Sequence, residues 1–154
     1  MHSFALASWN NKPGALLPEE LELVRSHVRI GHDLLAHIDA LKAIAAVVLH
    51  HHEWYDGTGY PAGLKGDEIP IAARIVCVVD AYGAMITRRS YKDAFTEEHA
   101  RAELARCTGT QFDPGVVEAF LRVLDSPEVQ TMDNAEFGVL PGFSTIRAFQ
   151  KGLD

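Results

Sequence analysis

Apolar side chains recur three, four and seven positions apart over much of the chain, a spacing typical of helices that bury one face. Pro18 and the two glutamates after it mark the first helix start, because proline fits the first helical position and carboxylates fit the positive end of the helix dipole. We expect Gly31 to bend or interrupt this helix before its apolar face continues to Ile38. The same spacing predicts further helices over residues 40–53, 71–87, 96–107 and 114–124.

The segment 71–87 contains the run IVCVVDAY, which by composition alone fits a buried strand as well as a helix. Its apolar positions keep helical spacing well beyond the length of a strand, so we expect a helix there. Thr96 and Asp113 are expected to cap the two helices that follow them, since short polar side chains satisfy the free amides of a helix start. Together these elements predict an all-α bundle of about six helices.

Glycine and proline residues interrupt the helical pattern between residues 56 and 70. A loop of this length without regular structure is usually functional. The two ends of the chain are less periodic than its middle. We expect residues 1–16 to form an irregular lead-in and residues 126–154 a C-terminal tail, on either side of a helical domain over residues 17–125.

The composition is that of a folded, acidic domain. The 154 residues are 47% hydrophobic, and 14 basic against 21 acidic side chains give a net charge of −7. This balance argues against disorder and against binding to a nucleic acid polymer. No apolar run approaches the ~20 residues that cross a bilayer, so no membrane partner is expected. The chain lacks the basic start of a secretory signal and has only two cysteines, which predicts a reducing, cytoplasmic setting.

Histidines are the first sign of chemistry in the chain. There are eight, and three stand in a row at His50, His51 and His52. Neighbouring residues on a helix point about 100° apart, so two adjacent histidines cannot easily ligate one metal from a regular helix. They can face two metals held side by side, as in hydrolytic sites with ions ~3.5–4 Å apart. Imidazole and carboxylate donors suit iron, manganese, zinc or nickel better than calcium or magnesium.

The segment HHEWYDGTGYP, residues 51–61, matches the signature HHExxDGxGYP of the HD-GYP family at every specified position. Agreement extends to LPEELELVRSHVRIG before it and to GLKGDEIP, ARIVCVVDAY and GTQFDPGVVEAF after it. The chain therefore resembles an HD-GYP domain over roughly residues 11–124. The resemblance implies an all-α fold of the HD superfamily and a metal-dependent phosphodiesterase that opens the second messenger cyclic di-GMP.

The resemblance also implies roles for particular residues. The implied metal ligands are His27, His51, His52 and Asp80. The implied loop beside the substrate is formed by Gly59, Tyr60 and Pro61. The implied phosphate contacts are the basic residues Arg89 and Lys92. The expected cofactor is a transition metal ion, iron or manganese first and zinc or nickel as alternatives, and the expected ligand is a cyclic dinucleotide.

Each of these assignments has a plainer structural alternative. A lone histidine such as His27 on a half-apolar helix more often packs against neighbours or faces solvent. Asp80 stands in an apolar stretch, where a carboxylate is rarely buried unless it is paired or bound to a metal, and this favours the functional reading. Arg89 and Lys92 also fit a solvated helix end, and the GYP residues also fit a simple turn. His50 has no implied role, and we expect it to be structural or to support the ligands.

The His-Asp dyad that names the family should stand before the turn at Asn11, on an earlier helix. The ten residues before Asn11 contain no such pair, and His32-Asp33 lies on the wrong side of His27. We therefore expect an N-terminally truncated domain that holds at most one metal tightly and hydrolyses its substrate slowly or not at all.

Two further consequences follow from this comparison with the family. Gly83 stands where a second carboxylate is expected, and its absence should loosen the surroundings of the metal. Without the earlier helices, apolar positions such as Leu21 and Val24 need another covering surface, which predicts a homo-oligomer or a partner that covers the missing helices.

Two functions from different classes remain open on the sequence. The first is an HD-GYP-type phosphodiesterase domain that acts on or binds cyclic di-GMP, with catalysis impaired by the absent dyad. The second is a non-catalytic signalling module that binds another protein through the GYP loop or the uncovered helical face. Stoichiometric transition metal in the purified protein favours the first, and its absence favours the second.

Overall fold

A computed structural model describes residues 17–87 and 95–130 of this chain. The chain separates into two compact units, Met1–Phe120 and Leu121–Asp154, which are described individually. Because the described ranges are 17–87 and 95–130, the candidate residues in positions 88–94 lie outside them. The predicted lead-in 1–16 and most of the predicted tail lie outside them as well. The domain boundaries remain predictions.

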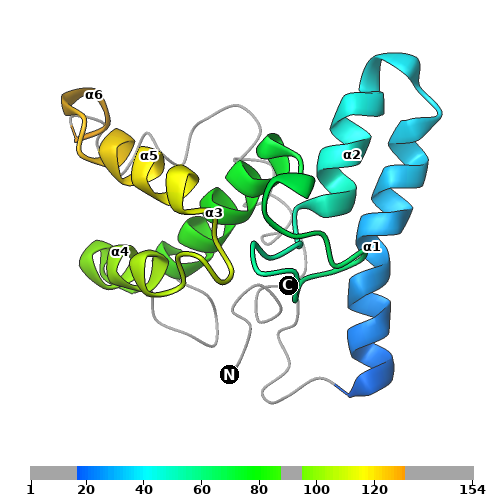
Figure 1. The fold of residues 1–154 in the computed structure, drawn as a ribbon, viewed down its shortest axis with the longest axis horizontal. Coiled ribbons are helices and arrows are strands. Elements are labelled where there is room, and N and C mark those ends of the chain that lie inside the picture. The colour runs from blue at the N-terminus through cyan, green and yellow to red at the C-terminus, as the bar shows by residue number, and fades with distance from the viewer. Residues whose placement is uncertain (1–16, 88–94, 131–154) are drawn as a thin grey trace, which may run out of the picture. The chain divides into compact units, whose positions relative to one another are not determined.

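The described residues form helices joined by loops, as Figure 1 shows. The elements are α1 (Pro18–Ala36), η2 (Asp39–Leu41), α2 (Lys42–His50), η3 (Gly66–Glu68), α3 (Ile71–Ile86), α4 (Glu97–Arg106), α5 (Pro114–Leu124) and the short α6 (Pro127–Gln130). Within the described ranges the extended pairing is limited to an isolated bridge between Thr108 and Phe112. The all-α prediction is confirmed, with a helix count close to the six expected. None of the described helices combines the length and the apolar content needed to cross a membrane.

The first helix differs from its prediction at Gly31. Helix α1 runs without a break through this position, so the expected interruption is wrong. A Cβ atom at Gly31 would lie 2.8 Å from Cγ1 of Val48, which is on α2. The glycine therefore permits close packing of α1 against α2, and Figure 1 shows these two helices side by side. Glycine is therefore required at position 31 by a tertiary contact, which the spacing of apolar residues along the helix does not reveal.

Helix α2 ends earlier than predicted, at His50 instead of residue 53. The backbone N–H of Glu53 donates to the carbonyl of His50 at 3.0 Å, a tighter turn than the helical pattern. The chain leaves the helix here because Glu53 turns inward and is only 2% exposed. His51 is thus the C-cap of α2, and His52 lies beyond the helix.

The remaining helices follow the sequence prediction closely. The run IVCVVDAY lies within α3, which confirms the helical interpretation. Thr96 caps α4 by accepting a hydrogen bond from the backbone of His99 at 3.2 Å. One face of α3 supplies much of the core, because its members recur at three- and four-residue intervals: Ala73, Cys77, Val78, Ala81, Tyr82 and Met85. This buried face fixes α3 as the support for the loop that precedes it.

Candidate functional site

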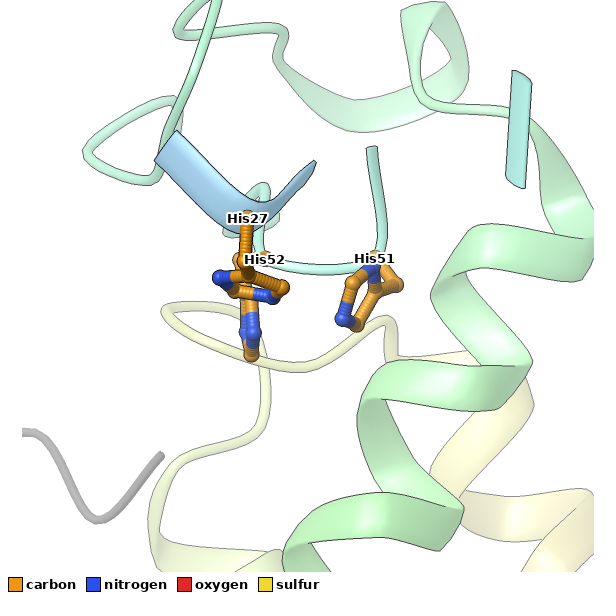
Figure 2. Close-up of side chains that lie close together, drawn as sticks. All are labelled: His27, His51 and His52. Carbon is orange, nitrogen blue, oxygen red and sulfur yellow. The ribbon is translucent and has the colours of Figure 1, made fainter. Parts of the chain in front are cut away.

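Three histidines that are far apart in the sequence meet in the structure. His27 comes from the middle of α1, while His51 and His52 come from the end of α2, and Figure 2 shows the three rings close together. Each offers a ligand atom within 4.8 Å of those of the other two. The ring centroids of His51 and His52 are 4.0 Å apart, and that of His27 lies 5.6 and 5.1 Å from them. The close packing of α1 against α2 brings this cluster together.

The hydrogen bonds of two histidines prepare them for metal ligation. Nδ1 of His51 lies 2.7 Å from the carbonyl oxygen of Val48, and Nδ1 of His27 contacts the carbonyl oxygen of Val24 in the same way. Because a carbonyl can only accept, the Nδ1 atoms carry the protons and each Nε2 presents a lone pair. Orientation of a ligating histidine by a backbone carbonyl is the usual support for a metal site.

Two of the three histidines, His51 and His52, are also held neutral. Burial lowers the pKa of His52 to about 3, and the neighbouring His51 and His27 lower it further in the same direction. Burial likewise lowers the pKa of His51, against an opposing effect of its bond to Val48. Neutral imidazoles that crowd together at physiological pH fit a transition metal, since the metal binds the unprotonated ring. The residues present therefore fit the group that the sequence predicts.

Asp80, the fourth predicted ligand, lies on α3 and is exposed. Its exposure removes the burial on which the preference for a metal-binding role at this position rested, because α3 is amphipathic and Val76 and Val79 beside it are also exposed. Its carboxylate nevertheless affects the site, because its charge raises the pKa of His51. This effect is smaller than those of burial, of the hydrogen bond to Val48 and of His27. Asp80 is not among the three residues whose ligand atoms cluster, so its ligation stays a prediction.

Residues 53–70, here called the GYP loop, are held in place by the buried side chain of Glu53. Its Oε1 accepts a hydrogen bond from the backbone of Ala62 at 2.7 Å, and its Oε2 accepts one from Leu64 at 3.1 Å. Nδ1 of His50 lies 3.5 Å from Oε1 of the same carboxylate, and the structural or supporting role of His50 stays a prediction. No role was assigned to Glu53 from the sequence. The glutamate of the motif was nevertheless a signal, because a carboxylate that becomes buried requires hydrogen-bond partners.

Gly59 is required by a close approach of two backbone segments. A Cβ atom there would lie 2.2 Å from the backbone nitrogen of Trp54 and 2.6 Å from two backbone atoms of Glu53. Since these are backbone atoms, no side-chain adjustment can make room. The glycine of the GYP motif thus lets the loop fold back over its own start, which places the next residue, Tyr60, beside His52.

Tyr60 joins the loop to the histidine cluster. Its ring stacks on that of His52 with centroids 5.0 Å apart, and its backbone N–H donates to the carbonyl of His52 at 3.1 Å. The guanidinium carbon of Arg25, on α1, lies 5.3 Å from the centroid of the Tyr60 ring. Burial raises the pKa of Tyr60 to about 12, so the phenol keeps its proton. Sequence reasoning missed Arg25, for which the sole signal is its place two residues before His27.

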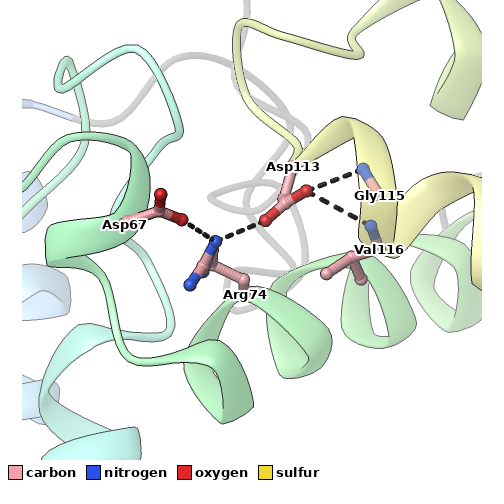
Figure 3. Close-up of polar contacts among 5 residues, drawn as sticks. All are labelled: Asp67, Arg74, Asp113, Gly115 and Val116. Carbon is pink, nitrogen blue, oxygen red and sulfur yellow. Dashed lines mark hydrogen bonds and ion pairs between the residues drawn. The ribbon is translucent and has the colours of Figure 1, made fainter.

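A second anchor holds the far end of the GYP loop, as Figure 3 shows. Nη1 of Arg74, on α3, donates to Oδ1 of Asp67 at 2.8 Å and to Oδ2 of Asp113 at 2.6 Å. Oδ1 of Asp113 accepts from the backbone of Gly115 and Val116 at 2.7 and 3.3 Å, which confirms its predicted capping of α5. One carboxylate thus links the start of α5 to α3, and the arginine extends the link to the loop at η3.

The remaining predicted residues have different outcomes. Gly59, Tyr60 and Pro61 lie in the GYP loop, and Tyr60 contacts the histidine cluster through His52. Arg89 and Lys92 fall in 88–94 and lie outside the described residues. His32 and Asp33 contact each other at 3.0 Å on α1, apart from the three clustered histidines.

Comparison with known proteins gives this site a family. Residues 5–116 match the family model described as HD domain. The chain is 45% identical over 114 residues to a cyclic di-GMP phosphodiesterase of Thermotoga maritima, a match that covers 73% of this chain and 31% of the relative. It is 44% identical over 119 residues to one of Vibrio cholerae, covering 73% of this chain and 24% of the relative. The chain thus spans about a quarter to a third of the curated relatives it matches.

A solved structure agrees on the fold. The crystal structure of a cyclic GMP-AMP specific phosphodiesterase of Vibrio cholerae matches with a TM-score of 0.61 and 20% sequence identity, over 83% of this chain and 33% of that one. A helical architecture, a histidine cluster beside the GYP loop, and a family match over most of its length lead to one assignment: the chain belongs to the HD domain family.

Proposed function

We propose that this chain is an HD-GYP-type phosphodiesterase domain that binds a transition metal and, beside it, cyclic di-GMP. The observation that carries the proposal is the cluster of His27, His51 and His52 against the GYP loop, with its ligand atoms gathered within 4.8 Å. The relatives from Thermotoga maritima and Vibrio cholerae, both described as cyclic di-GMP phosphodiesterases, support the choice of ligand. Iron or manganese fits the histidine and carboxylate donors best, with zinc or nickel as alternatives.

The residues of the chain would divide the work as follows. His27, His51 and His52 would hold the metal through Nε2, and Asp80 would supply a charged oxygen from α3. When bound, the metal supplies positive charge against the phosphate and activates water for its hydrolysis. The stacking of Tyr60 on His52 keeps the loop at the edge of the cluster, where Gly59, Tyr60 and Pro61 would contact the ligand.

Two more residues complete the proposed division of roles. Arg89 and Lys92 would neutralise a phosphate of the ligand, because charged donors form the stronger hydrogen bonds to phosphate oxygens.

We propose further that this chain binds the dinucleotide better than it hydrolyses it. Among the described residues, the metal-type cluster consists of three histidines and includes no carboxylate. A pair of metals needs a bridging acid to balance the charge and to hold the ions at a short separation. Three histidines with Asp80 suffice for one ion, so we expect one tightly bound metal per chain and weak turnover.

Metal analysis of protein purified without chelator tests this proposal, with His27→Gln as the variant and His37→Gln, an exposed histidine at the end of α1, as the control. We expect about one equivalent of iron or manganese in the wild type and in His37→Gln, and little in His27→Gln. Titration of the loaded protein with cyclic di-GMP and with cyclic GMP-AMP then compares the two ligands. Absence of metal from the wild type, or binding of neither dinucleotide, would contradict the proposal, and two or three equivalents would contradict the one-metal reading.

A second candidate function, a protein-binding module, is favoured by apolar side chains on the surface. Leu23 and Leu34 on α1 are 74% and 70% exposed, and Ile71, Ile75 and Val79 on α3 are also exposed. Such faces are typical of surfaces that meet a partner or a second copy of the chain. Light scattering distinguishes a self-associating chain from a monomer that awaits another protein, and the metal analysis distinguishes both from the first proposal.

A further inference from the structure

Four buried side-chain atoms have no hydrogen-bond partner in the described part of the chain, on Arg25, His50, Tyr60 and Arg74, and two of them belong to side chains that contact each other beside the histidine cluster. These two atoms are the hydroxyl oxygen of Tyr60 and Nε of Arg25. Buried polar groups in proteins are nearly always paired, so an unpaired one indicates a bound ligand atom or water. Two such groups on neighbouring side chains, next to a candidate metal site, therefore mark a place where something polar binds.

The side chains of Arg25 and Tyr60 contact each other, and Tyr60 contacts the cluster. The guanidinium carbon of Arg25 lies 5.3 Å from the centroid of the Tyr60 ring, and that ring stacks on His52. Arg25 precedes His27 by two residues on α1, so helix and loop contribute one donor each. A phenol hydroxyl carries one O–H donor and a guanidinium carries five N–H donors. Both groups can therefore donate.

Among the residues that the structure describes, no acid forms a hydrogen bond with the guanidinium of Arg25. Oε1 of Glu22 lies 3.6 Å from Nη1 of Arg25, which is beyond hydrogen-bond distance. The Glu22 side chain is 76% exposed. An exposed pair of this kind contributes little and is screened by salt. The guanidinium beside Tyr60 is thus available to an anion.

We propose that Arg25 and the hydroxyl of Tyr60 form a phosphate-binding pair, which holds one phosphate of a phosphodiester placed at the histidine cluster. The inference rests on the proposed function for the kind of ligand. It adds Arg25, which the family signature does not include, and it assigns the hydroxyl of Tyr60 to a phosphate. Phosphate fits because the planar guanidinium offers parallel donors to two of its oxygens, and a hydroxyl adds a third donor from the side. Stacking fixes the ring, so the hydroxyl approaches from a set direction.

Calorimetric titration of the metal-loaded full chain tests this pair, with cyclic di-GMP and inorganic phosphate as the two probes. The variants are Arg25→Gln, Arg25→Lys and Tyr60→Phe, and the control is Arg29→Gln, an exposed arginine one turn further along α1. We expect the dissociation constants for both probes to rise about ten-fold in Arg25→Gln and several-fold in Tyr60→Phe. The dissociation constants of Arg25→Lys should lie between those of the wild type and of Arg25→Gln, because lysine keeps the positive charge but lacks the two parallel donors of the guanidinium.

Metal content and melting temperature are measured on every variant, so that a lost fold is not read as lost binding. Tyr60→Phe keeps the ring and its stacking, and it should fold even if changes at Arg25 disturb α1. If the wild type binds cyclic di-GMP and the variants bind both probes equally well, the pair is overturned and the proposed function stands. If cyclic di-GMP fails to bind but phosphate binds in an Arg25-dependent way, the pair stands and the proposed function falls. Binding of neither probe overturns both.

Discussion

The GYP loop and helix α1 both contribute to the candidate site, but they are held in opposite ways. Apart from the short turn η3, the loop has no regular structure, yet Glu53 fixes it from inside and Arg74 ties its far end to Asp113. Helix α1 is regular over 19 residues, yet Leu23 and Leu34 on its surface are largely exposed. Regular structure and full burial are therefore separate properties here.

The difference teaches what each element requires. A loop has unpaired backbone groups, and a buried charged acceptor such as Glu53 satisfies two of them at once, so polar contacts alone can fix its shape. A helix satisfies its own backbone and needs only one packed face, which α2 provides. The site uses both: a rigid helix supplies His27, and an anchored loop supplies Tyr60.

The largest effect is expected where the loop anchor is also a helix cap, in Asp113→Ala. This change leaves Arg74, whose side chain is 13% exposed, without its buried partner, and it removes two hydrogen bonds at the start of α5. We expect the free energy of unfolding to fall by about 4 kcal/mol in urea denaturation. The control is Asp67→Ala: Asp67 contacts the same Nη1 but is 92% exposed, so its loss should cost less than about 0.5 kcal/mol.

Asp113→Asn separates the two contributions at this position, because asparagine is also a good cap but carries no charge. The free energy of unfolding of Asp113→Asn should lie between those of Asp113→Ala and the wild type. Equal stability of Asp113→Ala and Asp67→Ala would show that Arg74 is no anchor.

The next largest loss of stability is expected in Glu53→Ala, which removes the side chain that holds the backbone of the GYP loop. Two part-buried backbone N–H groups, those of Ala62 and Leu64, lose the buried carboxylate that accepts from them. We expect a loss of about 3 kcal/mol, measured by urea denaturation. Glu68→Ala is the matched control, because Glu68 accepts one backbone bond, from Lys65 at 3.0 Å, in an exposed place. If both variants lose the same stability, burial is not what makes Glu53 an anchor.

Local pattern explains which features could be predicted from the sequence. Helical spacing is a property of neighbouring residues, and it located α3 and α4 to within a residue or two at either end. Thr96 and Asp113 were predictable as caps because a cap acts on amides two or three positions away. The fold class and these helix starts therefore followed from the chain itself.

What could not be predicted depends on distant partners. Gly31 reads as a helix interruption until Val48 is seen against it, and Arg74 pairs with a residue 39 positions later. Asp80 looks buried from its neighbours, but α3 turns that side outward. Arg25 stands near a predicted ligand without any repeating pattern, and its relation to Tyr60 exists only once α1 and the loop are folded together.

The third prediction contrasts glycines of the loop and of a helix. In Gly59→Ala, the new Cβ meets backbone atoms at 2.2 and 2.6 Å, so the loop must move. We expect a loss of about 2 kcal/mol and weaker binding of cyclic di-GMP. Gly83→Ala on α3 meets no atom within 4 Å, and alanine should raise stability by up to about 1 kcal/mol. Thermal unfolding checks the opposite signs; a destabilised Gly83→Ala or an unaffected Gly59→Ala would contradict the comparison.

The smallest change in stability is expected on the outer face of α1, and it sharpens the comparison most. Leu34 is 70% exposed while Val28, on the same helix, is fully buried. Leu34→Ala should therefore cost less than about 0.5 kcal/mol and Val28→Ala about 2 kcal/mol in urea denaturation. If the exposed face of α1 is covered by a second copy, Leu34→Ala should instead weaken self-association, which light scattering measures over a concentration series. A stability loss in Leu34→Ala equal to that of Val28→Ala, at a concentration where the chain is monomeric, would show that this face is already covered within one chain.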